Sequence, residues 1–236
     1  MRYINQRDYP EMPYITRTDP ENPRHEHGKT TTVKTSGCGL CAAIMVADRL
    51  LPTYEFELED DLFGTHKGHD YVDLGLSVKW ATCNVGADSP EVYGNYYAWG
   101  EIVTKSRYSV ANCGTLEKNI GDIKGTSRDV AHQKWGGNWR MPTIDEFREL
   151  IDKCDWEWDG DGYIVTGPNG NSIFLPAAGL RYEDELYGNG SYGDYWSSTP
   201  YSENTENALV LEFCKGTWDI YKGDRYCGLS VRPVLE

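Results

Sequence analysis

One clear amphipathic helix lies in the second half of this chain, among short segments in which apolar and polar residues alternate. Apolar residues recur at helical spacing from Ile144 to Cys154, and Thr143 with Glu146 forms a capping box ahead of them. Strand-like alternation occurs over residues 72–80, 163–166, 172–175, 208–213 and 217–221, and a last apolar segment spans residues 228–234. Long stretches rich in glycine and aromatic residues separate these segments. We therefore predict an α+β fold with much irregular surface.

The character of the chain changes near residue 67. The chain begins with a polar segment dotted with proline, and apolar residues at helical spacing predict one helix over residues 39–51, ended by Pro52. An acidic run over residues 55–61 then marks a boundary. We predict a small N-terminal segment, residues 1–66, and a larger domain, residues 67–236. Because this domain begins and finishes on a strand, we expect its two ends to pair with each other.

The chain is strongly acidic, which restricts its partners. Lys and Arg number 23 and Asp and Glu number 37, giving a net charge of −14. A chain of that charge repels phosphate backbones and anionic lipid, so we expect no nucleic-acid partner. No stretch approaches the roughly 20 apolar residues of a membrane span, so we expect no membrane insertion. The first seven residues lack the apolar core of a secretory signal, so we expect either a mature form or a chain that reaches its location without the general secretory route.

The cysteines and acidic residues do not predict a metal site or a cofactor. The seven cysteines are odd in number and show no framework spacing, so we expect no obligatory disulfides. Cys38 and Cys41 form one C-x-x-C pair, but no second pair completes a zinc site. Acids at alternate positions of residues 155–162 resemble a calcium loop. Its twelfth position is Thr166, which cannot supply the bidentate carboxylate, so we predict a tight acidic turn there.

Five ordered motifs of the larger domain resemble one family. They occupy residues 68–86, 96–101, 139–147, 195–199 and 228–234. Together they resemble the Fibrobacter succinogenes major paralogous domain family, common in gut Bacteroidetes and their phages, over residues 68–236. The resemblance implies a C-type lectin-like fold. Several members of that family are the target-binding variable proteins of diversity-generating retroelements, whose mutagenesis concentrates near the C-terminus, on the ligand-binding face.

Residues 179–228 resemble such a variable region. Adenine-directed mutation of Asn codons yields Tyr, Asp, Ser, Gly and Cys, and Tyr, Asp and Asn recur through this segment. Rigid aromatic side chains with adaptable polar neighbours suit a binding surface. Glu203, Glu212 and Trp218 depart from the pattern and are expected to be template-encoded. The predicted ligand-binding residues are Tyr182, Asp184, Tyr187, Asn189, Tyr192, Asp194, Tyr201, Asn204, Asn207, Trp218, Asp219, Tyr221, Asp224 and Tyr226. The alternative is that these are solvated loop residues that contact nothing.

The resemblance implies a binding protein and not an enzyme. We expect the variable loops to recognise a cell-surface protein or a glycan, from an extracellular location or the surface of a phage particle. Calcium-dependent sugar binding is not supported, because the Glu-Pro-Asn and Trp-Asn-Asp strings of true C-type lectins are absent. A structural or adhesin module whose loops fill space is a further hypothesis.

The start of the chain resembles a different family. Residues 3–10 and 36–45 are similar to the opening of papain-like cysteine peptidases, with Gln6 at the oxyanion-hole position and Cys38 at the nucleophile position. A helix N-terminus lowers a thiol pKa, which suits such a nucleophile. The peptidase also needs a His base, and only His66 and His69 lie between Cys38 and the body of the second domain. We therefore expect residues 1 to about 60 to be a truncated remnant without activity, retained for docking or assembly. A cysteine peptidase or amidase that uses Cys38 is the alternative.

Overall fold

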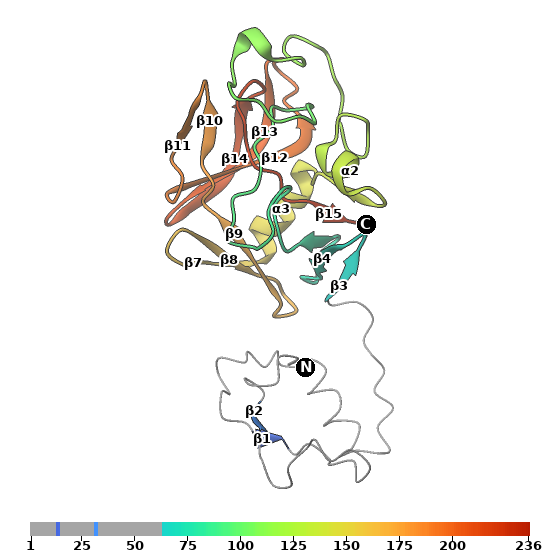
Figure 1. Ribbon diagram of the computed structural model, residues 1–236, viewed down its shortest axis with the longest axis vertical. Helices are drawn as coiled ribbons and strands as arrows, with labels where there is room; N and C mark the ends of the chain where they lie inside the picture. Colours follow the sequence, from blue (N-terminus) through green and yellow to red (C-terminus); the bar gives the residue numbers. More distant parts are fainter. Residues whose placement is uncertain (1–12, 15–30, 33–62) are drawn as a thin grey trace, which may run out of the picture. The chain divides into compact units, whose positions relative to one another are not determined.

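The computed structural model describes residues 63–236 and two short strands, β1 (Pro13–Tyr14) and β2 (Thr31–Thr32), which pair in antiparallel fashion (Figure 1). The chain divides into two compact units, residues 1–60 and 61–236. The helix predicted over residues 39–51, together with Gln6 and Cys38, lies outside the described residues.

A five-stranded sheet joins the beginning and the end of the second unit. Its strand order is β3-β4-β5-β15-β6, with β15 antiparallel to both neighbours. The strands are β3 (Phe63–His66), β4 (His69–Val72), β5 (Lys79–Ala81), β6 (Trp139–Arg140) and β15 (Val234–Leu235). The pairing of β15 with β5 confirms that the two ends of the domain meet.

Two antiparallel three-stranded sheets and one hairpin make up the rest of the strands. The longest sheet has the order β12-β13-β14 and holds β12 (Tyr192–Pro200), β13 (Asn207–Cys214) and β14 (Thr217–Asp224). The second holds β7 (Asp155–Trp158), β8 (Gly162–Thr166) and β9 (Ser172–Pro176). The hairpin consists of β10 (Leu180–Tyr182) and β11 (Glu185–Tyr187), at the upper left of Figure 1. The domain is thus a mixed fold that consists mostly of strands.

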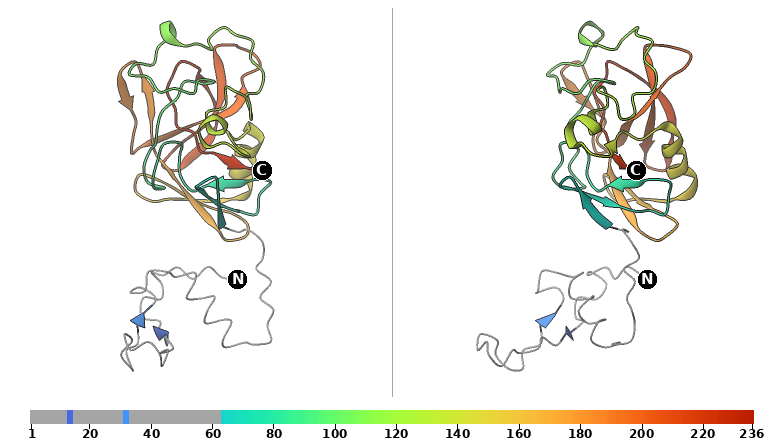
Figure 2. Two further views of the ribbon diagram at one scale, coloured as in Figure 1. Left: turned by 45° about the vertical axis from the view of Figure 1, so that its right-hand side comes forward. Right: turned by 90° about the vertical axis from the view of Figure 1, so that its right-hand side faces the viewer.

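The helices within residues 63–236 are few and short. They are α2 (Val130–Trp135), α3 (Ile144–Lys153) and a 3-10 turn at Val110–Asn112. The predicted capping box of α3 is confirmed, because Thr143 Oγ1 accepts from the Glu146 N–H and Glu146 Oε2 accepts from the Thr143 N–H. Ile144, Phe147 and Leu150 are buried, and α3 packs against β12, β13 and β14 (Figure 2).

Apolar residues cover both faces of the β12–β14 sheet. Successive side chains of a strand point to opposite faces. Val210 and Trp196 belong to one buried cluster, whereas Leu211 and Tyr195 belong to the other, which α3 completes. The sheet therefore lies between two buried clusters. Its polar residues reach the surface at the ends of the strands and on the edge strand β14.

Residues 72–80 do not form the single strand that their alternation predicts. Strand β4 ends at Val72 and β5 begins at Lys79. Between them the Asp73 carboxylate accepts a hydrogen bond of 2.6 Å from the Gly75 N–H, and Gly75 has a φ of 74°, which turns the backbone. Leu74 is nevertheless fully buried. The alternation of apolar and polar residues therefore predicts correctly that Leu74 is buried, but it does not predict the backbone conformation, which is a turn.

Two further segments also differ from their predictions. Asp155–Trp158 is strand β7 instead of a turn, because Trp156 packs its ring 5.4 Å from that of Tyr163 on β8. The acidic turn follows the strand, at residues 159–161. The last apolar segment is extended only at its end, in β15, while residues 228–230 form isolated bridges to Arg181, Tyr97 and Tyr195.

Candidate functional site

Tyrosine side chains are exposed on the β10–β11 hairpin and on one face of the β12–β14 sheet. The exposed fractions are 41% for Tyr182, 46% for Tyr187, 48% for Tyr192 and 46% for Tyr221. Tyr226 is half-buried, with its ring centroid 6.0 Å from that of Tyr182. The name tyrosine face is used below for these five residues.

The strand register explains how this surface forms. Trp196 lies opposite Val210, which lies opposite Tyr221, so Tyr221 shares a face with Trp196. Tyr192 is four residues before Trp196 on β12 and shares that face as well. The hairpin leaves the sheet edge at Gly179, whose N–H donates to the Tyr192 carbonyl at 2.7 Å. Gly179 has a φ of 65°, and a Cβ there would lie 2.1 Å from the Tyr187 carbonyl oxygen, so the close approach requires glycine.

The fourteen predicted ligand-binding residues fall into three groups by exposure. Eight are exposed, namely Tyr182, Asp184, Tyr187, Asn189, Tyr192, Asn204, Asp219 and Tyr221. Four are half-buried, namely Tyr201, Trp218, Asp224 and Tyr226. Asp194 and Asn207 are buried, with 5% and 7% exposed. The sequence pattern does not separate these groups, because Asp occurs in all three and Tyr and Asn each occur in two of them.

Trp218 does not lie on the tyrosine face. It alternates with Asp219 and Tyr221 along β14 and points to the opposite side of the sheet. There its ring stacks on Trp156 at 5.5 Å and meets Tyr163 edge-on at 5.3 Å. Trp218 therefore packs at the border of the core, on the other side of the sheet from Tyr221.

Asn207 and Tyr201 organise the β12–β13 turn. The Asn207 amide Nδ2 donates to Asp224 Oδ1 at 2.7 Å, while its Oδ1 accepts from the Asn204 amide at 3.0 Å. The Tyr201 hydroxyl donates to Glu203 Oε2 at 2.7 Å. Strand β12 separates Tyr201 from Tyr192 by roughly 30 Å at 3.3 Å per residue. The predicted residues therefore do not form one patch, and Asn207 serves as an internal brace.

A buried arginine fixes the segment that carries Asp224 and Tyr226. Arg225 is 1% exposed, its Nε–H donates to the Asn207 carbonyl at 3.0 Å, and its Nη1 donates to the Lys118 carbonyl at 2.9 Å. The guanidinium carbon lies 4.2 Å from the ring centroid of Trp99. Arg225 is not among the residues predicted from the sequence, because no motif around it indicates a contact with residues more than 100 positions away.

Three acidic side chains form a row across the same face of the sheet. Asp194 on β12 lies opposite Glu212 on β13, which lies opposite Asp219 on β14. Burial and, to a smaller extent, the charge of Glu212 raise the pKa of Asp194 to about 7. Burial also raises the pKa of Glu212. The row is named the carboxyl row below.

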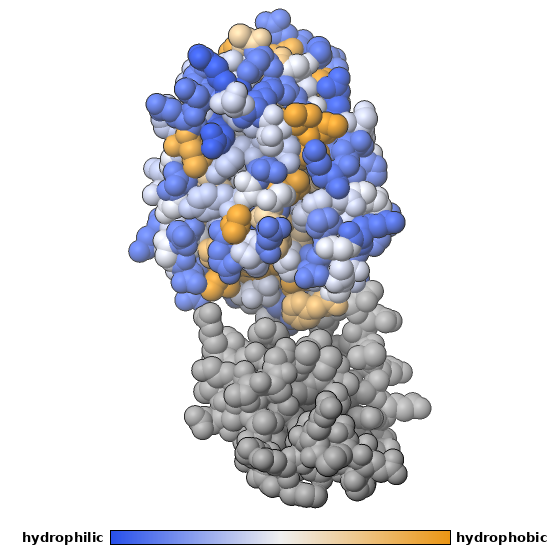
Figure 3. All heavy atoms as spheres, in the orientation of Figure 1, coloured by the Kyte–Doolittle hydropathy of each residue, from blue (hydrophilic) through white to orange (hydrophobic). Residues whose placement is uncertain are grey.

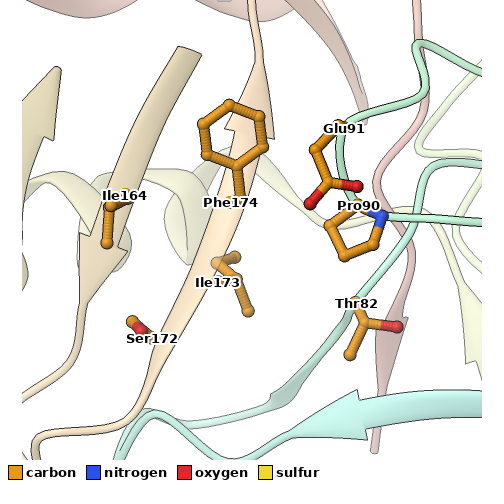
Figure 4. Close-up of a pocket in the computed structure, with 7 residues that line it drawn as sticks. All are labelled: Thr82, Pro90, Glu91, Ile164, Ser172, Ile173 and Phe174. Carbon is orange, nitrogen blue, oxygen red and sulfur yellow. The ribbon is translucent and has the colours of Figure 1, made fainter. Parts of the chain in front are cut away.

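Two hollows border the domain surface. One, of about 480 Å³, lies between residues 107–112 and the hairpin residues Tyr182 and Glu183, and the Arg107–Glu183 ion pair joins its two sides. Val110, 58% exposed, lines it together with Tyr182 of the tyrosine face. The other, shown in Figure 4, lies over β8 and β9 beside Pro90 and Glu91 and contains none of the predicted contact residues. In the view of Figure 3, hydrophilic residues predominate and hydrophobic ones form small separate groups.

The described histidines pack around two tryptophans. The His69 ring stacks on Trp135 at 3.8 Å. His66 Nε2 accepts from the Asn138 N–H at 3.4 Å, and His132 Nδ1 lies 3.2 Å from the Trp139 carbonyl oxygen. Burial lowers the pKa of His69. These rings are engaged in packing inside the second unit.

Among residues 63–236, no group of three or more His, Cys, Asp or Glu side chains is arranged to hold a metal ion. None of the helices in this described part is long and apolar enough to cross a membrane. The cysteines at positions 83, 113, 154, 214 and 227 are all free thiols.

Comparison with known proteins places the larger domain. Residues 72–235 match the family model described as the Lcl C-terminal domain. No curated protein and no solved structure matches the chain. The match begins in β4 and ends in β15, so it covers the pairing that closes the domain as well as the tyrosine face. Because this match spans well over half of the sequence, the chain belongs to the Lcl C-terminal domain family.

Proposed function

We propose that the second unit is a ligand-binding module that recognises its partner through the tyrosine face. The observation that carries this proposal is the exposure of Tyr182, Tyr187, Tyr192 and Tyr221, each above 40%, on paired strands. Tyrosine offers a large contact area at low entropic cost and a hydroxyl for hydrogen bonding. Membership of the Lcl C-terminal domain family is consistent with a variable, receptor-binding role.

The rigidity of the scaffold supports a binding role. The β12–β14 ladder and the β10–β11 hairpin hold the backbone of all four exposed tyrosines, and Arg225 holds the segment of Tyr226. A surface that is ordered before binding loses less conformational entropy when a partner docks. Asp184, Asn189 and Asp219 are exposed between the tyrosines and add polar contacts.

The finer proposal follows from the sequence resemblance. We propose a C-type lectin-like fold whose residues 179–228 are diversified by a retroelement, with a cell-surface protein or a glycan as the partner. All five residues of the tyrosine face lie inside that segment. We also propose that the chain has no enzymatic activity and acts outside the cell or on a phage particle.

The test compares binding by the intact chain with binding by a face variant. The full chain would be screened against a displayed random-peptide library and a glycan array. The quadruple variant Tyr182→Ser, Tyr187→Ser, Tyr192→Ser and Tyr221→Ser is expected to lose at least 100-fold in affinity for any ligand found, with an unchanged circular dichroism spectrum. Val92→Ser with Val103→Ser, at residues that are 48% and 64% exposed and are not among the five tyrosines, is the matched control. Ligands that bind the quadruple variant as tightly as the parent chain would overturn the proposal, as would an absence of binding in both screens.

A further inference from the structure

The carboxyl row lacks the positive charge that such an arrangement normally requires. Asp194, Glu212 and Asp219 are direct cross-strand neighbours, and opposite residues on one face have Cβ atoms about 4.5–5.5 Å apart. Like charges at that spacing repel each other. Within residues 63–236 none of the three carboxylates forms an ion pair with Lys, Arg or His.

Asp194 is the member of the row that needs a partner most. Its side chain is only 5% exposed, and among residues 63–236 no side chain or backbone N–H donates a hydrogen bond to its carboxylate. The carboxylate oxygens are not among the fully enclosed polar atoms of the domain, so a group from outside can reach them. A carboxylate this little exposed is stabilised by a hydrogen-bond donor. The titratable groups that act on or feel Asp194 are Glu212 across the ladder, the neighbouring Tyr195, and Cys227, whose thiol pKa burial raises to about 12. None of these groups is a cation.

The surroundings of the row favour an organic cation. Tyr192 precedes Asp194 by two residues on the same face of β12, and Tyr221 follows Asp219 by two residues on the same face of β14. Aromatic faces attract ammonium and guanidinium groups, and carboxylates form short charge-assisted hydrogen bonds with them. A compact metal ion is less suitable, since no three acidic groups in residues 63–236 converge closely enough to ligate one.

We propose that the carboxyl row receives a cationic side chain, Arg or Lys, of a protein partner that docks on the tyrosine face. The inference rests on the proposed function and names the chemistry of the ligand. A guanidinium is the best fit, because its planar fork presents donors to two carboxylates on neighbouring strands at once. The bound cation supplies Asp194 with the hydrogen bonds that the domain itself does not provide.

The test uses methylguanidinium as the probe and carboxyl carbon NMR of the full chain as the readout. Methylguanidinium is expected to shift the Asp194 carboxyl resonance saturably and to lower the apparent pKa of Asp194 by about one unit, since bound cation favours the ionised form. Asp194→Asn should weaken binding at least 10-fold, read at the Glu212 resonance. Glu212→Gln, read at Asp194, provides a second variant. Asp152→Asn, at an exposed position of α3, is the matched control and should bind like the parent chain.

Three results would overturn the cation site. The first is an Asp194 resonance that does not respond to methylguanidinium. The second is an equal response to the neutral analogue N-methylurea, and the third is saturation by Ca²⁺ at a lower concentration. The peptide screen separates this failure from failure of the proposed function. Suppose that peptides without Lys or Arg lose affinity for the quadruple tyrosine variant but bind Asp194→Asn with the same affinity as the parent chain. That result would overturn the cation site alone. Suppose instead that methylguanidinium binds saturably at Asp194, while peptides and glycans bind the quadruple tyrosine variant as tightly as the parent chain. That result would overturn the proposed function.

Discussion

Arg232 donates its Nε–H to Asn84 Oδ1 at 2.8 Å, inside the domain, where neither side chain is exposed to solvent. The other guanidinium hydrogens bond to the carbonyl oxygens of Ala81, Thr82 and Phe174 at 2.6–3.0 Å. One side chain near the end of the chain thus connects the segment after β5 with strand β9. Asn84 and Arg232 belong to two of the motifs singled out in the sequence, and their contact explains why both strings occur together.

Replacing Arg232 should therefore destabilise the whole domain. In Arg232→Lys the ammonium cannot satisfy four acceptors in this fixed arrangement, so buried carbonyl oxygens lose their partners. We expect the free energy of unfolding to fall by about 3 kcal/mol or more, measured by urea denaturation. Arg148→Lys, at an exposed position of α3, is the control and should change it by less than about 0.5 kcal/mol. A loss below about 1 kcal/mol for Arg232→Lys would contradict this account.

The parts of the fold that could be predicted are those set by neighbouring residues. Helix α3 has its capping residues and its apolar face within eleven positions, and strands β8, β9, β13 and β14 each carry their own pattern. Residues 72–80 are an exception: their alternating pattern predicts a strand, but the hydrogen bond from the Gly75 N–H to the Asp73 carboxylate holds a turn there. Strand β12 went unpredicted, since six consecutive residues from Gly193 to Ser198 are buried on both faces and show no alternation.

The capping box of α3 gives a smaller and purely local prediction. Thr143→Ala removes the hydroxyl that accepts from the Glu146 N–H, which leaves one helix N–H without its partner. We expect a loss of about 1 kcal/mol in the free energy of unfolding. Thr104→Ala, at an exposed position in an irregular segment, should have an effect near zero in the same denaturation experiment. Equal effects of the two changes would show that the cap contributes nothing.

Asp194 should make stability depend on pH. The pKa of its carboxyl rises from 3.8 to about 7 on folding, so between those values the folded state holds a proton that the unfolded state releases. Stability from this group is complete below about pH 4 and is lost as pH rises through 7, a difference of at most about 4 kcal/mol. Asp194→Asn removes this loss and should be more stable than the parent at pH 8, with a smaller gain at pH 5. Asp152→Asn is the control, and a gain independent of pH would refute the assignment.

The candidate site was less predictable than the fold. The sequence pattern directed attention to a segment that does expose several tyrosines, because Tyr, Asp and Asn recur through residues 179–228. It could not show that Asp194 and Asn207 are largely buried, since their burial depends on the register with Glu212 and Asp224 on other strands. Tertiary pairing, and not residue type, decides how exposed each polar side chain is.

Trp218 and Tyr221 provide the sharpest comparison, because they lie three residues apart on β14 and point to opposite faces. Trp218→Ala removes a ring stacked on Trp156 and should cost about 2–3 kcal/mol of stability. Tyr221→Ala removes a side chain that is 46% exposed and should cost less than about 0.5 kcal/mol. Affinity for a ligand from the peptide screen should show the reverse order, with a loss for Tyr221→Ala and none for Trp218→Ala below its unfolding temperature. Loss of affinity in Trp218→Ala alone would place the binding surface on the side of β7 and β8 instead.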